Sequence, residues 1–293
     1  MSSTGPTLPP ELASRVEEEL GPVLGSAPLP RVGVGGTTWR VSTRGGVTLL
    51  KRCRSRRAFE DERRALSSWG PHLGGRAPNL LAAWAEPTPA LLIQLLSGRT
   101  ADRWSFSAEL ERDLWRQAGG LLARLHHLSS FEDDDPLPLS DALSARAGAT
   151  LDRCAELLPS SSRARVVERL SDFSDFAELR RVPCHRDYQP GNWLVRVDDA
   201  RIELSLIDFE WARPDAWLVD LVRLHSHAWR DRPERREAFL EGYGRELDDA
   251  DLLRLEKLAW LDLVGTLAWA VEHEDAELEQ TTRARLDMEL ARG

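Results

Sequence analysis

The chain has 293 residues, of which 42% are hydrophobic and 30% charged, and its formal net charge is −9. This length and composition predict one or two domains with a sizeable core and exclude a disordered chain. No apolar run approaches the ~18 residues that a membrane span needs, and the first 20 residues lack the basic start and apolar centre of a signal peptide. The acidic charge argues against general nucleic-acid binding. Three widely spaced cysteines fit a reducing compartment better than a disulfide framework, so we expect a cytoplasmic protein without membrane or nucleic-acid partners.

The first third of the chain is predicted to be rich in β-strands. A short lead-in over residues 1–30 contains a helix that starts at Pro9-Pro10 and stops at Gly21-Pro22. Short apolar runs separated by glycine turns then predict strands, and one helix interrupts them. The expected strands are 32–34, 38–41, 47–50, 82–85 and 90–96, and the helix is 58–69, ended by Gly70-Pro71.

The rest of the chain is predicted to be mainly helical, with a small β patch in its middle. The acidic run 132–135 lies in a polar loop and is expected to be solvated. The expected helices are 107–128, 141–158, 162–179, 218–229, 233–243 and 248–272, and the expected strands are 182–184, 193–197 and 204–207. These elements predict an α+β fold with two lobes, a β-rich lobe over 1–98 and a larger, mainly helical lobe over 99–293.

The β patch carries the most informative polar residues. Asp187 and Asn192 follow one short apolar strand, Asp208 follows another, and 21 residues separate the two aspartates. A hairpin of this length returns to its starting place, so the three side chains are expected to converge. Carboxylate and amide oxygens suit Mg²⁺, and a carboxylate near a hydroxyl can accept its proton. The alternative is a surface hairpin with a Pro-Gly turn and no chemistry.

A lysine in the first lobe supports the chemical interpretation. Only Lys51 and Lys257 are lysines among 39 basic residues, and Lys51 ends an apolar strand. A compact ammonium suits a point contact with phosphate oxygens. Glu62, on the following helix, is placed to hold this lysine, although it could equally be one of several solvated helix acids. Upstream, Gly35-Gly36 forms a turn whose backbone N–H groups could approach phosphates, or a plain hairpin.

The order of these motifs resembles the protein-kinase-like phosphotransferases. It resembles the aminoglycoside phosphotransferase and choline kinase-like family more closely. The features that carry this likeness are Leu-Ala-Arg-Leu-His at 122–126, Ile-Asp-Phe-Glu-Trp-Ala at 207–212, Asp-Leu at 220–221 and the apolar stretch 90–98. Only 12 residues separate Asp208 from Asp220, which leaves no room for a protein-kinase activation segment. The likeness covers about residues 30–225.

The resemblance implies a bilobal protein-kinase-like fold and a role for each matched residue. Asp187 is implied as the catalytic base, Asn192 and Asp208 as Mg²⁺ ligands, and Lys51, held by Glu62, as the contact to the phosphates of ATP or GTP. His185 and Asp220 are implied as structural supports of the catalytic loop, and His126 as a packed helix residue. The remaining implied nucleotide contacts are Gly35, Gly36, Thr37 and Thr38 over the phosphates, and the backbone of Gln94, Leu95 and Leu96 at the base.

Two positions depart from the pattern of many antibiotic kinases. Arg186 stands where those proteins have glycine, and its guanidinium would pair with a nearby acid or contact the substrate. Glu210 would lie either at the metals or behind their ligands. Neither departure removes a catalytic group.

The acceptor is the least determined part of the prediction. We expect a monomer or weak dimer that phosphorylates a hydroxyl of a small molecule, an aminoglycoside-like antibiotic or related natural product. Acidic residues after the metal motif would attract such polycations if they lined a cleft, and would otherwise be solvated helix faces. They are Asp231, Glu234, Glu241, Glu246, Asp248, Asp249, Asp251, Glu272, Glu274 and Asp275. The alternatives are a kinase of peptide Ser/Thr in natural-product maturation and a nucleotide-binding pseudokinase that serves as an interaction module.

Overall fold

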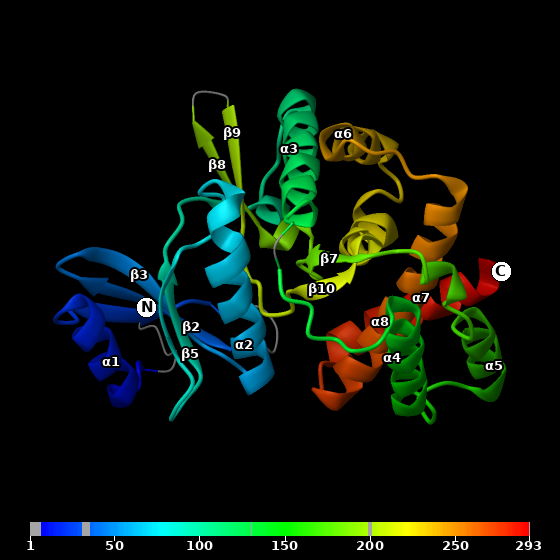
Figure 1. Ribbon diagram of the computed structural model, residues 1–293, viewed down its shortest axis with the longest axis horizontal. Coiled ribbons are helices and arrows are strands. Elements are labelled where there is room, and N and C mark those ends of the chain that lie inside the picture. Colours follow the sequence, from blue (N-terminus) through cyan, green and yellow to red (C-terminus); the bar gives the residue numbers. More distant parts are fainter. Residues whose placement is uncertain (1–6, 31–35, 130, 199–200, 293) are drawn as a thin grey trace.

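The computed structural model describes residues 7–30, 36–129, 131–198 and 201–292. Figure 1 shows an antiparallel sheet with two helices in the N-terminal part and a larger, mainly helical C-terminal part, which confirms the predicted α+β class. No helix among the described residues is both long and apolar enough to cross a membrane. The three cysteines are buried and unpaired.

The N-terminal sheet has five strands in the order β1-β2-β3-β5-β4, and all neighbours are antiparallel. The strands are β1 (Gly25–Pro28), β2 (Thr37–Thr43), β3 (Gly46–Arg52), β4 (Leu80–Trp84) and β5 (Ala90–Gln94). Four of the predicted strands are therefore present, and the strand expected at 32–34 lies outside the described residues. The lead-in contains β1, which the sequence analysis did not predict because its Gly-Ser-Ala-Pro composition carries no strand signal.

Helices cover both faces of this sheet (Figure 1). On one face, α1 (Pro10–Leu20) packs Leu12 and Val16 against Leu50 and its neighbours. On the other face lies α2 (Arg56–Arg64), which buries Phe59 and Glu62. Side chains alternate along β3, so Lys51 points to the face opposite Leu50 and meets α2.

The helix predicted over 58–69 is longer and less regular than expected. After α2 the chain continues as a π-helical turn, Ala65–Trp69, and then as a 3₁₀ turn, Gly70–Leu73. Pro71 does not end the helix because it lies in the first turn of the 3₁₀ segment, where its missing N–H has no partner to lose. Gly74, with a φ of 64°, ends the segment.

The C-terminal part contains the remaining long helices. They are α3 (Ala108–His126), α4 (Leu139–Arg153), α5 (Ser160–Arg169), α6 (Pro233–Tyr243), α7 (Asp249–Glu272) and α8 (Ala276–Arg292). Ser107 and Asp248 cap α3 and α7 by accepting backbone hydrogen bonds. Helix α8 was not predicted. The predicted helix 162–179 ends at Arg169 instead, and 218–229 is divided into a 3₁₀ turn (Trp217–Leu221) and a π-helical turn (Leu224–Ala228).

Two small sheets present the polar motifs. The pair β7 (Arg181–Cys184) and β10 (Arg213–Ala216) is antiparallel, and β8 (Trp193–Asp198) lies between β6 (Arg99–Thr100) and β9 (Arg201–Leu206). The loop 185–192 thus connects β7 to β8, and the loop 207–212 connects β9 to β10. Both loops cross from one small sheet to the other, which brings their polar residues to the same place.

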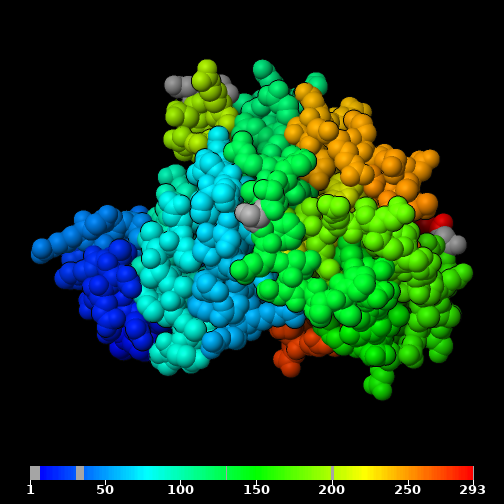
Figure 2. Space-filling model, in the orientation of Figure 1, coloured from blue at the N-terminus to red at the C-terminus, as the bar shows by residue number. Residues whose placement is uncertain are grey.

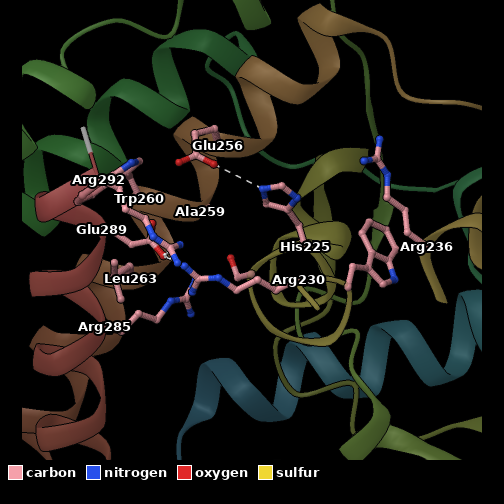
Figure 3. Close-up of a pocket in the computed structure, with 12 residues that line it drawn as sticks. His225, Arg230, Arg236, Glu256, Ala259, Trp260, Leu263, Arg285, Glu289 and Arg292 are labelled. Carbon is pink, nitrogen blue, oxygen red and sulfur yellow. Dashed lines mark hydrogen bonds and ion pairs between the residues drawn. The ribbon is translucent and has the colours of Figure 1, made fainter. Parts of the chain in front are cut away.

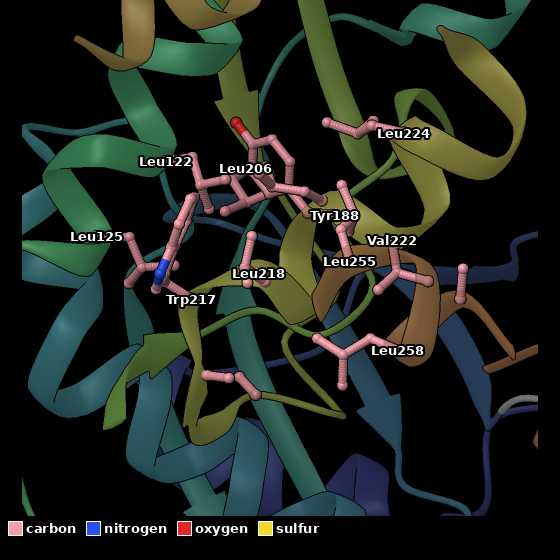
Figure 4. Close-up of a cluster of buried hydrophobic side chains, with 14 of the residues drawn as sticks. Leu122, Leu125, Tyr188, Leu206, Trp217, Leu218, Val222, Leu224, Leu255 and Leu258 are labelled. Atoms are coloured by element: carbon pink, nitrogen blue, oxygen red, sulfur yellow. The ribbon is translucent and has the colours of Figure 1, made fainter. Parts of the chain in front are cut away.

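The main core lies beneath these loops. Figure 4 shows apolar side chains converging from α3, from the segment after β10 and from α7. Tyr188 contributes its ring to this cluster, and its hydroxyl donates to the Ala118 carbonyl at 2.7 Å. The loop is therefore fixed to α3 by a residue next to Asp187.

The acidic run 132–135 is not simply solvated. Asp134 pairs with Arg64 of α2 at 2.9 Å, and Asp133 and Asp135 lie within 3.5 Å of Arg181. In Figure 2 the green residues of this stretch lie against the blue-cyan α2. The run therefore connects α2 to β7.

Candidate active site

The loop between β7 and β8 holds Asp187 in a fixed position. The Asn192 amide nitrogen donates to the Asp187 Oδ2 at 2.7 Å and to its backbone carbonyl at 2.8 Å. The Gln189 amide donates to the Asp187 Oδ1 at 2.9 Å. The 3₁₀ turn Pro190–Asn192 closes this loop and buries Asn192. Asp187 and Asn192 therefore come together as the sequence predicts.

Asp220 braces the same loop from below. Its carboxylate is 1% exposed and accepts hydrogen bonds from the backbone N–H groups of His185 and Arg186 and from His126 Nε2. The His126 Nδ1 in turn lies 2.8 Å from the Tyr243 hydroxyl. A buried carboxylate with three donors is well satisfied, so this arrangement fits the structural roles predicted for Asp220 and His126.

His185 connects the loop to the segment after β9. Its Nε2 lies 3.0 Å from the Ile207 carbonyl, and its Nδ1 accepts the Asp187 backbone N–H at 3.3 Å. A carbonyl can only accept and an N–H can only donate, so these two contacts place a proton on Nε2 and leave Nδ1 as the acceptor. His185 thereby ties Asp187 to the residue that precedes Asp208.

Lys51 lies at the centre of a buried charge cluster. Its Nζ is 2.7 Å from Glu62 Oε2, 2.5 Å from Asp208 Oδ1 and 3.6 Å from Glu210 Oε2. Arg54 completes the cluster at 3.3 Å from Glu210. The cluster joins the N-terminal sheet, α2 and the loop after β9. The sequence analysis predicted the contact with Glu62. Glu210 pairs with Lys51 and Arg54, and its place relative to the metals stays a prediction.

The charges in the cluster shift one another's pKa values. Burial disfavours the Lys51 ammonium, but Asp208, Glu62 and Glu210 outweigh it and hold the Lys51 pKa above its ordinary value. Burial raises the Glu62 pKa to about 7, although Lys51 opposes this. At Asp208, burial is outweighed by Lys51 and the pKa falls. Lys51 is thus held as a cation and Asp208 as an anion.

Backbone strain is concentrated at two residues of the site. Arg186 and Asp208 have φ values of 64° and 67°, in a region that residues other than glycine rarely adopt. The side chain of Arg186 pairs with Asp215, at 3.0 Å between Nε and Oδ2. Arg146 lies 2.7 Å from the same Asp215 oxygen. Of the two roles considered for Arg186, the structure supports pairing with an acid.

The predicted nucleotide contacts lie along β2, β3 and the end of β5. Gly35 lies outside the described residues. A side chain at Gly36 would meet the Arg52 carbonyl at 2.0 Å, so only glycine allows this close approach to β3. Thr37 and Thr38 follow in β2, where Thr38 is opposite Lys51. Gly36, Thr37 and Thr38 therefore lie beside the end of β3 that carries Lys51, and their contact with phosphates stays a prediction.

The predicted contact with the nucleotide base lies at the end of β5. The Gln94 N–H is used by the Asn79 carbonyl at 2.9 Å, and the Gln94 side chain accepts from the Asn79 N–H at 3.2 Å. The main chain of Leu95 and Leu96 continues beyond Gln94, the last residue of β5. Contacts to a nucleotide base would therefore involve Leu95 and Leu96 rather than the Gln94 N–H.

Sequence reasoning missed Arg223. Its Nη1 lies 2.9 Å from Asp187 Oδ1, and it directly precedes the π-helical turn Leu224–Ala228. Burial raises the Asp187 pKa, and the Arg223 charge opposes that rise. No local pattern distinguishes this arginine from others on a helix surface, because its role depends on a contact across 36 residues.

The oxygen donors of the site suit a divalent cation. Asn192 uses its amide nitrogen on Asp187, which leaves its amide oxygen for a metal. Around Lys51, Asp208 and Glu210 match the charges of Lys51 and Arg54, and Glu62, whose pKa is raised to about 7, adds a partial negative charge near neutral pH. Hard oxygen ligands with excess negative charge fit Mg²⁺.

Comparison with known proteins gives the family. The model described as "Phosphotransferase enzyme family" matches residues 28–258. No curated protein matches the chain. Among solved structures, the chain is similar to the GDP and kanamycin complex of an APH(2")-type phosphotransferase, with 15% identity, a TM-score of 0.76 and coverage of 97% of this chain and 99% of that one.

Two further structures show the same fold. A type I macrolide 2'-phosphotransferase has 18% identity and a TM-score of 0.65, with coverage of 94% of this chain and 95% of that one. A spectinomycin phosphotransferase solved with ADP and spectinomycin has 15% identity and a TM-score of 0.63, with coverage of 97% and 93%. Because the family model spans well over half of its residues, this chain belongs to the phosphotransferase enzyme family.

Proposed function

We propose that the protein transfers the terminal phosphoryl group of ATP or GTP, with Mg²⁺, to a hydroxyl of a small molecule. The observation that carries the proposal is the Lys51 cluster, in which one ammonium joins Glu62 of the N-terminal part to Asp208 of the C-terminal part. The same loops hold Asp187 through Asn192. Phosphoryl transfer depends mainly on positioning and on electrostatic stabilisation, and this site supplies both.

Each group has a distinct role in this proposal. Lys51 contacts the phosphate oxygens as a point charge, and Glu62 fixes its position. Asn192 and Asp208 would hold Mg²⁺, which neutralises charge on the phosphates when it is bound. Gly36 and the start of β2 lie over the phosphates. The main chain of Leu95 and Leu96, which follows β5, would contact the base.

Asp187 would act on the acceptor. Its carboxylate orients the hydroxyl and accepts the proton as the oxygen attacks phosphorus. Asn192 and Gln189 hold its two oxygens, so the carboxylate is fixed before the acceptor binds. Arg223 offsets part of the rise in the Asp187 pKa that burial causes and so favours its charged form. The proton thus moves from the hydroxyl to a group that is positioned and charged in advance.

The chemical class of the acceptor is argued from the solved relatives and from the acidic residues after Asp208. The solved relatives include complexes with kanamycin and spectinomycin, which supports a hydroxylated natural product as the acceptor here. Several of the acids expected to attract polycations are already paired: Glu234 with Arg232, Glu241 with Arg112, Asp251 with Arg245 and Glu272 with Arg153. The attraction expected from these acids is therefore weakened.

A transfer assay with radiolabelled ATP, Mg²⁺ and a panel of hydroxylated acceptors tests the proposal. We expect Asp187→Asn to lower turnover by about 10²–10⁴-fold and to leave nucleotide binding intact. Asp287→Asn, an exposed aspartate on α8, is the control and should match the wild type. Near-normal turnover in a folded Asp187→Asn variant would reject the role of Asp187. Nucleotide binding without any turnover would favour a pseudokinase. Transfer of the radiolabel only to peptides would favour a peptide kinase.

A further inference from the structure

Arg223 is held in a fixed position beside Asp187. It lies three residues after Asp220, which braces the loop of Asp187, and it directly precedes the π-helical turn Leu224–Ala228. Its neighbours Val222 and Leu224 are 3% and 0% exposed, so the backbone at Arg223 is anchored in the core. A side chain on such a backbone keeps a defined place next to the proposed base.

Within the described residues, one nitrogen of the Arg223 guanidinium has a partner. Its Nη1 lies 2.9 Å from the Asp187 Oδ1, and no other carboxylate or hydrogen-bond partner of the described chain contacts the guanidinium. The Arg223 side chain is 37% exposed, whereas that of Asp187 is 15% exposed. A guanidinium carries five N–H donors in a rigid fork. Most of these donors are therefore open to a molecule that reaches the site from solvent.

The exposed part of Arg223 does not belong to a separate pocket. A cavity of about 300 Å³ lies between the π-helical turn, α7 and α8. Figure 3 shows His225, Arg230 and Arg285 along this cavity. Neither Arg223 nor Asp187 lines it. The open N–H groups of Arg223 are thus associated with the proposed base and not with this cavity.

An acceptor hydroxyl that reaches Asp187 comes to lie beside Arg223. Asn192 donates to the Asp187 Oδ2, and Gln189 donates to the Oδ1, next to which Arg223 lies. A carboxylate offers about four lone-pair positions, so these three neighbours leave one of them open. Because the two oxygens of one carboxylate are adjacent, a hydroxyl in the open position is also a neighbour of the guanidinium.

The chemistry of a guanidinium limits what can stand next to that hydroxyl on the acceptor. A guanidinium donates hydrogen bonds and accepts none, so its partner must carry a lone pair. Hydroxyl, ether, carbonyl and carboxylate oxygens meet this requirement. An ammonium offers only donors and a positive charge, so it would face the guanidinium donor to donor.

We propose that Arg223 is a specificity-determining residue that binds an oxygen beside the hydroxyl to be phosphorylated. The acceptor then has oxygen substituents on two adjacent carbons, and not a hydroxyl next to an amino group. This inference rests on the proposed phosphotransferase function and adds the substitution pattern of its acceptor.

Three alcohols that differ at one carbon test the inference. They are trans-1,2-cyclohexanediol, cyclohexanol and trans-2-aminocyclohexanol, which carry a hydroxyl, a hydrogen and an ammonium beside the common hydroxyl. Ligand-observed NMR measures their binding to the protein with Mg·ADP in the nucleotide site. We expect the diol to bind about ten-fold or more tightly than the other two, because it gains a hydrogen bond from a charged donor. In Arg223→Gln this preference should be lost.

Arg116→Gln is the matched control. Arg116 also pairs with one aspartate, Asp113 at 2.7 Å, but it lies on the exposed surface of α3. This variant should keep the preference for the diol. Equal affinity for Mg·ADP in the wild type and both variants checks that each is folded, and the comparison of the three alcohols in the wild type depends on no variant.

Three results would overturn the inference. They are no binding of any of the alcohols, equal binding of all three, and a preference for the diol that survives in Arg223→Gln. Transfer from radiolabelled ATP is measured on the same samples and on the wider panel of acceptors. A diol preference that depends on Arg223, without transfer to any acceptor, would keep the recognition by Arg223 and reject the proposed function. Transfer without a diol preference would keep the function and reject the inference.

Discussion

Lys51 and Lys257 are the two lysines of the chain, and their surroundings differ. Lys51 contacts three carboxylates, whereas Lys257 pairs with Asp175 alone at 2.8 Å and is more exposed. We expect Lys51→Arg to lower phosphotransfer by about 10²-fold, because a forked guanidinium cannot take the place of a compact ammonium between fixed oxygens. The free energy of unfolding should change little, since the positive charge is retained. Steady-state transfer rates and urea unfolding measure both.

Lys257→Arg serves as the matched control. It makes the same chemical change at a residue with one acidic partner, so its transfer rate should equal that of the wild type. Equal, small effects at both positions would mean that Lys51 does not contact phosphate.

Asp215 is expected to stabilise the fold in a pH-dependent way. It is the shared partner of Arg186 and Arg146, whose charges outweigh burial and lower the Asp215 pKa below its ordinary 3.8. The unfolded carboxyl binds its proton at higher pH than the folded one, so the stabilisation is complete above about pH 4 and is lost as the pH falls through the folded pKa. We expect Asp215→Asn to lower the free energy of unfolding by about 3 kcal/mol at pH 7.

Urea unfolding at pH 7 and at pH 3 tests how the stabilisation by Asp215 depends on pH. The gap between Asp215→Asn and the wild type should narrow at pH 3, where the Asp215 carboxyl of the unfolded wild type is mostly protonated. Asp152→Asn, an exposed change on α4, should show no gap at either pH. A gap that is constant with pH would show that packing, rather than charge, accounts for the loss.

The residues that the sequence placed correctly share one property. Asp187 and Asn192 lie on one short loop, and Lys51 and Glu62 lie on a strand and the helix that follows it, so their spacing constrains their contact. Arg223 and Asp215 were not identified. Their partners lie 36 and 29 residues away, and each is one arginine or aspartate among many in this chain. Such contacts depend on the tertiary arrangement of elements, which residue spacing does not determine.

Helices α3 and α6 approach each other through glycines. An added Cβ at Gly242 would lie 1.9 Å from the Arg116 carbonyl, and one at Gly119 would lie 2.0 Å from the Phe239 carbonyl. Both neighbours are helix backbone, so the helices would have to separate. We expect Gly242→Ala to lower the free energy of unfolding by about 2 kcal/mol or more. Turnover should also fall, because Tyr188 hydrogen-bonds Ala118 of α3 and lies next to Asp187.

A glycine-to-alanine substitution at another position should have the opposite effect on the free energy of unfolding. Gly148 lies inside α4, and a Cβ there meets nothing within 4 Å. Gly148→Ala should raise the free energy of unfolding by roughly 0.5–1 kcal/mol, because alanine has the higher helix propensity. Chemical unfolding of the two variants compares them directly. Equal effects of Gly242→Ala and Gly148→Ala would mean that α3 and α6 are not in close contact in solution.

At the level of elements, long periodic segments were predictable and short ones were not. Helices α3 and α7 carry caps and regular apolar positions, and their predicted bounds agree with the structure to within two residues. Strands β6 and β10 have only two and four residues and contain arginine or proline, so their strand character comes from pairing with β8 and β7. The π-helical turn Leu224–Ala228 has helical periodicity in sequence. Its i→i+5 hydrogen bond, from the Trp229 N–H to the Leu224 carbonyl at 2.9 Å, distinguishes it from an α-helix.

Across the whole molecule, the two parts share one apolar cluster and are also joined by several polar contacts. Lys51 reaches Asp208, Arg64 reaches Asp134, and the Leu206 N–H donates to the Arg76 carbonyl at 2.7 Å. The first of these contacts is in the proposed nucleotide site. A nucleotide held between Lys51 and Asp208 would therefore add contacts across the junction and stabilise the folded protein by mass action.

This argument predicts a stabilisation that requires Mg²⁺. At about 100 times its dissociation constant, Mg·ATP should stabilise the protein by ~2.7 kcal/mol, which raises Tm by several degrees. ATP with EDTA should stabilise it much less, because Asp208 and Glu210 already match the charges of Lys51 and Arg54 and disfavour a polyanion without its metal. Differential scanning calorimetry of the wild type, Asp208→Asn and the control Asp287→Asn separates the stabilisation that requires Mg²⁺ from the stabilisation by the nucleotide alone. Asp208→Asn should lose the Mg²⁺-dependent increment and Asp287→Asn should keep it. An equal rise in Tm with and without Mg²⁺ would contradict a metal site at Asp208.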